Sequence, residues 1–153
     1  MNQAPAPSSD TDIRAAQPPA IVRTAGGSVL GTGALVLLVV LQTFTGFSLD
    51  SRTTTVLVVL GLLGGATVVA GLRLMRARAG SAVAGLMASG VLFLATTSWL
   101  LFSFLGGLFS VFALLAPVVA LLGIALSAAS LGPCQKVAAA RARLAEQGLD
   151  LGL

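Results

Sequence analysis

Apolar residues dominate this chain in long runs, and few of those runs contain the polar positions that mark a water-facing side of a helix or strand. The longest run, 79–135, contains no Lys, Arg, Asp or Glu. At about 1.5 Å per residue, one helix of that length would far exceed the roughly 30 Å hydrocarbon core of a bilayer. The run therefore predicts a hairpin of two membrane-spanning helices, at about 80–104 and 108–131, with Gly106 and Gly107 in its turn.

Two further spans precede this hairpin. Residues 24–48 carry no charge and have a wholly apolar centre, so they are long enough to span a membrane. A short loop with Asp50 and Arg52 leads to a second span at about 53–72, close to the minimum length for crossing. The predicted fold class is therefore all-α: a polytopic membrane protein with a four-helix transmembrane bundle at 24–132.

The two ends of the chain are more polar than its centre. Residues 1–23 are rich in Pro, Ser and Asp without an apolar period, which predicts a disordered N-terminal tail rather than a cleaved secretory signal. Gly132 and Pro133 predict the end of the fourth span. Residues 133–153 then form a basic C-terminal tail with a short helix, which is either solvated or lies on an anionic membrane surface.

Composition favours a lipid-facing surface over a water-facing one. Hydrophobic residues make up 56% of the chain and charged residues only 9%, against about 25% charged in an ordinary soluble domain. The mean hydropathy is +0.99. The net charge of +4 does not indicate nucleic-acid binding, because the arginines flank apolar runs instead of forming a stripe with interleaved aromatic residues.

The basic residues predict the orientation of the spans. With four spans, all nine Lys and Arg residues except Arg52 fall on one side of the membrane. Basic residues beside membrane spans favour the cytoplasmic side, so both termini are expected in the cytoplasm. Arg strongly outnumbers Lys, and Ala and Gly are abundant, which is typical of a GC-rich bacterial genome. We therefore expect a bacterial inner membrane.

Small residues recur at four-residue spacing along the spans, which places them on one face of each helix. Such faces let two backbones approach closely and gain dispersion contact where lipid surrounds the helices. We predict that these residues pack helices together within the chain, with a second copy or another membrane protein as the alternative partner. The packing candidates are Gly27, Gly31, Gly61, Gly65, Ser81, Gly85, Ser89, Gly123 and Ser127.

Polar side chains inside the spans are uncharged. Most hydroxyls can bond the carbonyl four residues back, whereas Gln42 cannot do so as easily. Two interpretations of Gln42 stay open: an interhelical hydrogen bond, or the wall of a cavity shared with Thr43, Thr96 and Thr97 at similar depth. Pro117, in the middle of the fourth span, predicts a kink that is either structural or a gating hinge.

Residue types that carry most enzyme chemistry are scarce. The chain has no His, which excludes Ser–His and Cys–His pairs and His-bearing metal sites, so we expect no catalytic, cofactor-binding or metal-binding residues. In span number and size the chain resembles the small multidrug resistance transporters and the four-span fluoride channels. It lacks the first-span glutamate of the former and the intramembrane Arg and Asn of the latter, so we assign it to neither family.

These observations favour a non-catalytic function. The leading hypothesis is a small scaffold or accessory subunit of a bacterial inner-membrane assembly, with the lipid bilayer and a membrane protein as partners and no nucleic acid. The alternative is an oligomeric pore or holin-like permeability protein assembled through the small-residue faces. Holins are also small, with few intramembrane charges and a charged cytoplasmic tail, so this alternative rests on analogy.

Overall fold

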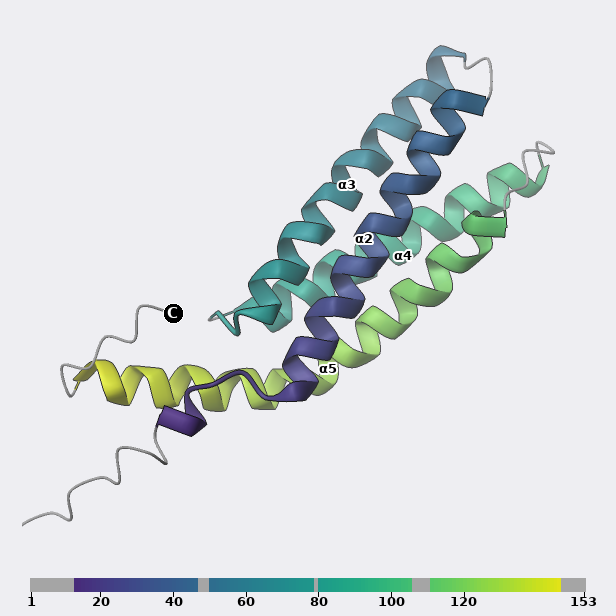
Figure 1. The fold of residues 1–153 in the computed structure, drawn as a ribbon. Coiled ribbons are helices and arrows are strands. Elements are labelled where there is room, and N and C mark those ends of the chain that lie inside the picture. Colours follow the sequence, from purple (N-terminus) through teal and green to yellow (C-terminus); the bar gives the residue numbers. More distant parts are fainter. Residues whose placement is uncertain (1–12, 47–49, 79, 106–110, 147–153) are drawn as a thin grey trace, which may run out of the picture.

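The computed structural model is all-helical and describes residues 13–46, 50–78, 80–105 and 111–146 (Figure 1). Its long helices are α2 (Ala20–Gly46), α3 (Ser51–Met75), α4 (Ser81–Leu105) and α5 (Val111–Glu146). These four helices are long and apolar enough to cross a membrane, which confirms the predicted all-α fold with four candidate spans. The turn predicted at Gly106 and Gly107 lies outside the described residues.

The four helices form two antiparallel pairs that pack into a bundle. α2 pairs with α3 and α4 with α5, and the pairs meet where α2 packs on α5 and α3 packs on α4. In Figure 1 the two pairs lie close together at the end that carries Ile13 and Glu146 and separate towards the opposite end. We call the first end the basic end, because every Lys and Arg except Arg52 belongs to it.

Glycines bring the backbones of α2 and α3 into direct contact. A Cβ atom on Gly33 would lie 2.7 Å from the carbonyl oxygen of Gly64, and a Cβ atom on Gly71 would lie 2.8 Å from that of Gly26. Real Cβ atoms do not approach backbone this closely, so neither position has room for a side chain. The contact recurs every seven residues on each helix, which keeps the two helices together for two turns.

The GxxxG pairs predicted to pack these two helices lie beside this close contact. Among the described residues, no atom of another element would lie within 4 Å of a Cβ on Gly31 or Gly65. Gly27 and Gly61 would make only ordinary contacts of 3.8 Å, with the side chains of Met75 and Val40. Both helices are apolar around their circumference, so glycine spacing alone does not identify the face that meets the partner.

Serine and glycine alternate across the α4–α5 interface. Ser89 is fully buried, and its Oγ would lie 3.0 Å from a Cβ on Gly123. Ser127 is also fully buried, and its Oγ would lie 3.2 Å from a Cβ on Gly85. Each serine thus packs on the glycine of the opposite helix. Together with buried Ser81, these are the positions predicted for packing in the third and fourth spans, and here the predicted residues do face another helix.

The fourth helix does not end at Gly132 and Pro133 as predicted. α5 continues through both Pro117 and Pro133 to Glu146, and Figure 1 shows that its yellow C-terminal part bends away from the bundle. Pro133 cannot donate the backbone bond to the carbonyl four residues back, which is a common cause of such a bend. We call residues 133–146 the arm. Its helix persists because Cys134 and Val137 join the main core cluster beside Val22 and Leu74.

The segment before α2 also differs from the prediction. Residues 13–15 form one helical turn, and α2 begins at Ala20, so part of the tail predicted as disordered is ordered. Ala16 is fully buried, and Leu144 on the arm is 2% exposed. Figure 1 shows the N-terminal segment running beside the arm. The arm is therefore not a freely solvated tail helix, because its apolar side is covered by this segment and by the bundle.

A glycine pair tests which backbone contact holds α2 in the bundle. Gly33→Ala places a methyl group 2.7 Å from the Gly64 carbonyl oxygen, where only backbone can move aside. We expect the variant to lose about 1–3 kcal/mol of unfolding free energy, the usual cost of overpacking. Gly31→Ala is the matched control, because a methyl group there meets no atom within 4 Å.

Thermal unfolding of the parent and both variants in detergent measures the difference. Gly31→Ala should unfold at the parent temperature or slightly above it, because alanine is the better helix former. Equal unfolding temperatures for the Gly33 and Gly31 variants would contradict close contact between the backbones of α2 and α3.

Candidate functional site

A groove opens between α3 and α4 at the end of the bundle opposite the basic end. It has a volume of about 550 Å³. Its walls come from the first half of α3 and the last third of α4, and its floor includes Leu60, which is 5% exposed. Trp99, Ala95 and Leu63 line it and pack against the second core cluster. The groove exists because the two helix pairs separate towards this end (Figure 1).

Arg52 lies at the start of α3 and lines the groove, which makes it the cation of this site. Its guanidinium group forms no hydrogen bond or ion pair with the described residues. Its neighbour Asp50 is engaged as the N-cap of α3, where its carboxylate accepts a hydrogen bond of 2.9 Å from the backbone N–H of Thr53. The side chain and backbone of Thr53 lower the pKa of Asp50, so the carboxylate stays ionised at neutral pH.

Hydroxyl groups give the groove its remaining polarity. Ser98 and Thr55 donate to the carbonyls of Leu94 and Ser51 within their own helices, so their hydroxyl protons are already used. Ser103 is different. It lines the groove, its side chain is only 3% exposed, and its Oγ forms no hydrogen bond among the described residues. The groove thus combines an apolar channel with one guanidinium group, while the unsatisfied Oγ of Ser103 is buried behind its lining.

The polar residues predicted to share a cavity do not come together. Gln42 is exposed on α2, and neither of the two pockets described here is lined by Gln42, Thr43 or Thr97. Thr43 and Thr96 each donate to the carbonyl four residues back. Thr96 borders a void of about 10 Å³. Neither of these two pockets therefore brings the four residues together.

Other buried hydroxyls lie along the helix interfaces. The Oγ1 atom of Thr32 on α2 lies within hydrogen-bonding distance of two carbonyl oxygens. It is 2.8 Å from that of Ser28 on its own helix and 3.2 Å from that of Val119 on α5. This bond across helices links the two pairs at mid-depth. Pro117 is buried two residues before Val119, and α5 passes through it without interruption. Buried hydroxyls without a hydrogen bond among the described residues are Ser28, Ser81, Ser89, Thr97, Ser103 and Ser127.

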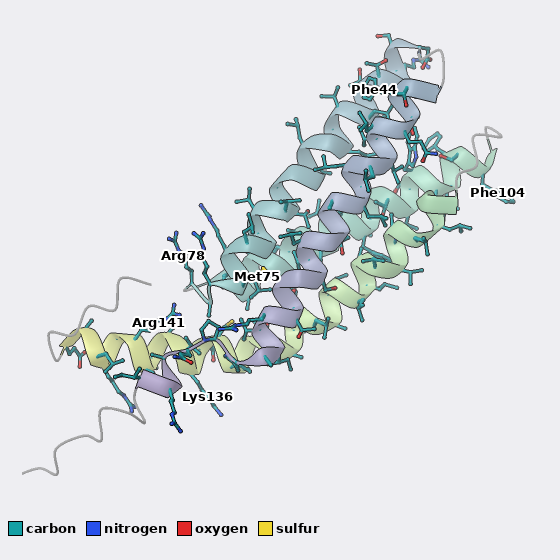
Figure 2. All side chains as sticks on the ribbon, in the orientation of Figure 1. Phe44, Met75, Arg78, Phe104, Lys136 and Arg141 are labelled. Carbon is teal, nitrogen blue, oxygen red and sulfur yellow. The ribbon has the colours of Figure 1, made fainter. Side chains whose placement is uncertain are left out.

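Arg141 on the arm closes the basic end of the bundle. Its Nε donates to the carbonyl of Ala16 at 3.2 Å, and its Nη1 donates to the carbonyls of Arg76 and Ala77 at 3.1 and 3.3 Å. Figure 2 shows Arg141 directed towards the turn that carries Arg78, while Lys136 points to the opposite side of the arm. One guanidinium group therefore ties together the N-terminal segment, the turn after α3 and the arm.

The turn that Arg141 binds has a defined geometry. Ala77 adopts a φ of 47°, its N–H donates to Leu74, and the N–H of Arg78 donates to Arg73. This is the Schellman pattern of helix termination, in which glycine usually occupies the position of Ala77. The methyl group of Ala77 is 1% exposed and belongs to the main core cluster, and this burial offsets the strain. Arg141 then satisfies carbonyls that the helix end leaves free.

Comparison with known protein families, characterised proteins and solved structures finds no match to this chain. Among the described residues, no three potential metal ligands gather. The features that sequence reasoning missed are the groove around Arg52 and Trp99 and the contacts of Arg141. Both depend on how the helices are placed and rotated against one another, which the sequence does not show. The one signal for the groove was the isolated position of Arg52, the only basic residue at its end of the bundle.

Replacing Arg141 tests its role in closing the basic end. Arg141→Gln removes a charged donor from three backbone carbonyls, and bonds to a charged group are worth about 1.5–3 kcal/mol each before solvent screening. We expect a lower unfolding temperature and faster amide hydrogen exchange at residues 16–25 and 133–146. Arg143→Gln is the control, because Arg143 is exposed and carries the same charge on the same arm. Equal exchange in both variants would show that the arm is held by its apolar contacts alone.

Proposed function

We propose that this chain is a small non-catalytic integral membrane protein of a bacterial inner membrane that serves as a scaffold or accessory subunit of a membrane assembly. The observation that supports this most is the arm. It is a helix continuous with a candidate membrane span, it bends away from the bundle, and Arg141 holds it to two other segments. A helix fixed in this way presents a constant surface to a partner, which is what a scaffold requires.

The charge of the arm indicates the kind of partner. Lys136 and Arg143 are exposed, and in Figure 2 Lys136 points away from the bundle. Arg141 is occupied by backbone carbonyls, so the exposed charges remain available. An acidic surface of a neighbouring membrane protein matches this arrangement, because opposite charges steer and orient an association even where each contact contributes little energy.

Photo-cross-linking from the arm tests the scaffold function. A photoreactive amino acid at Ala142, which is exposed on the arm, should form protein adducts of one discrete mass in cells of the source organism. The same amino acid at Val83, exposed on α4, is the matched control and should form no such protein adduct. Arg141→Gln should reduce the adduct at Ala142 severalfold, because a released arm no longer presents a fixed surface.

The alternative function, an oligomeric or holin-like pore, is favoured by one observation. Among the described residues, a Cβ on Gly31 or Gly65 would meet no atom of another element within 4 Å, so these two small-residue positions leave space for another copy. Dye-loaded liposomes separate the two functions. A scaffold leaves the dye inside, whereas a pore releases it in proportion to the protein added. Release that disappears in the Gly31→Leu, Gly65→Leu double variant, with no adduct at Ala142, would contradict the scaffold and support the pore.

We also propose that the basic end faces the cytoplasm. The support is the distribution of charge, since all basic residues except Arg52 belong to that end and basic flanks favour the cytoplasmic side. A reporter that is active only outside the cytoplasm should work when inserted after Arg52 and fail when inserted after Arg78. Activity after Arg78 would mean that the bundle is inverted, and activity at both positions would mean mixed orientation.

A further inference from the structure

The groove between α3 and α4 has the size of a site for one small amphiphile. Its volume of about 550 Å³ falls within the range of roughly 300–1,000 Å³ typical of pockets that hold one small molecule. A spanning helix, about 10 Å wide and 30 Å long, takes up on the order of 2,000 Å³. The groove is therefore too small to enclose a helix from another chain, but it has room for a single aliphatic chain.

The position of its polar groups matches the head of a lipid. Arg52 lies in the first turn of a candidate span and Trp99 near the end of another, so both belong at the level of the headgroups, where Trp is commonly found. A guanidinium group pairs with phosphate through two parallel hydrogen bonds. Asp50 lies two residues before Arg52 and attracts it electrostatically, but the two side chains form no ion pair among the described residues, so the guanidinium donors stay available to a phosphate.

Ser103 borders the same groove with its side chain. Its Oγ is itself almost without accessible surface and forms no hydrogen bond among the described residues, so the hydroxyl group does not face the open part of the groove. The polar recognition of a ligand therefore falls to Arg52.

We propose that the groove between α3 and α4 binds one acyl chain of a phospholipid, with the phosphate held by Arg52. The acyl chain itself gains little from entering the groove, because the surrounding lipid is equally apolar. Selectivity therefore comes from the polar contacts. The proposal does not depend on the scaffold function, since either a scaffold or a pore would carry the groove.

The single tryptophan of the chain reports on the groove directly. The purified full-length protein in detergent is titrated with phosphatidylglycerol carrying brominated acyl chains, which quench tryptophan on contact. Diacylglycerol with the same brominated chains is the matched lipid, because it keeps the apolar part and the esters but lacks the phosphate. We expect saturable quenching of Trp99 at an about tenfold lower concentration of phosphatidylglycerol, the ratio expected from one charge-assisted hydrogen bond.

Two pairs of variants assign the effect to the groove. Arg52→Gln should remove the preference for phosphatidylglycerol, whereas Arg23→Gln, at the basic end, should retain it. Ala95→Phe fills the groove and should abolish saturable quenching. Leu94→Phe adds an aromatic ring at the adjacent position, which is 66% exposed and outside the groove, and should bind as the parent does.

Three outcomes would overturn the proposal. Equal quenching of the parent by both lipids would mean that no phosphate is bound. Quenching that never saturates would mean contact with surrounding lipid only. A dimer in native mass measurements that Ala95→Phe dissociates, without a lipid preference, would mean that a second copy of the chain occupies the groove. If Ala95→Phe fails to fold, the exposed Arg52 still decides: loss of the phosphatidylglycerol preference in Arg52→Gln supports the proposal, and an unchanged preference overturns it.

Discussion

The bundle depends on close backbone contact, because lipid offers helices no hydrophobic reason to associate. A leucine is as well solvated by acyl chains as by another helix, so stability has to come from dispersion between closely packed atoms and from hydrogen bonds. The Gly26–Gly71 and Gly33–Gly64 contacts supply this for α2 and α3. Serines packed on glycines supply it for α4 and α5. The wide lipid-facing surface, with many exposed leucines and valines, then needs no further explanation.

The two ends of the bundle are completed in different ways. At the basic end, Arg141 joins three chain segments through their carbonyl groups, and the main core cluster lies beneath it. At the other end the helix pairs separate, beyond the hydrogen bond between α2 and α5 that Thr32 supplies at mid-depth. The groove is the consequence. A bundle closed at one end and spread at the other leaves space between α3 and α4.

The sequence was sufficient for the number and type of the long helices and for the approximate limits of the first three. Uncharged runs of spanning length have one stable conformation in lipid, and the arginines between them mark the turns. It also identified the packing faces of α4 and α5, where serines stand out from an apolar background. It failed for α2 and α3, because glycines occur on several faces and spacing does not rank them. Only the structure shows that Gly33 contacts the backbone of α3 and that Gly31 does not among the described residues.

The arm and the groove could not be predicted for a related reason. Pro133 is a reliable local signal for the end of a helix, yet the burial of Cys134 and Val137 and the bonds of Arg141 outweigh it. Equal depth suggested that Gln42 and Thr96 share a cavity, but rotation about the helix axis decides which side chains meet. Local signals set where a helix can stop, and tertiary contacts decide whether it does.

Arg52 is the residue that the architecture alone does not account for. Every other basic residue belongs to the end where basic flanks favour the cytoplasmic orientation, and Arg52 opposes that bias. Asp50, close by, offsets its charge, but Asp50 already caps α3 and needs no cation to do so. The guanidinium group is thus left facing the groove with its donors unused among the described residues. The phosphate proposed for the groove would give this guanidinium group a partner of opposite charge.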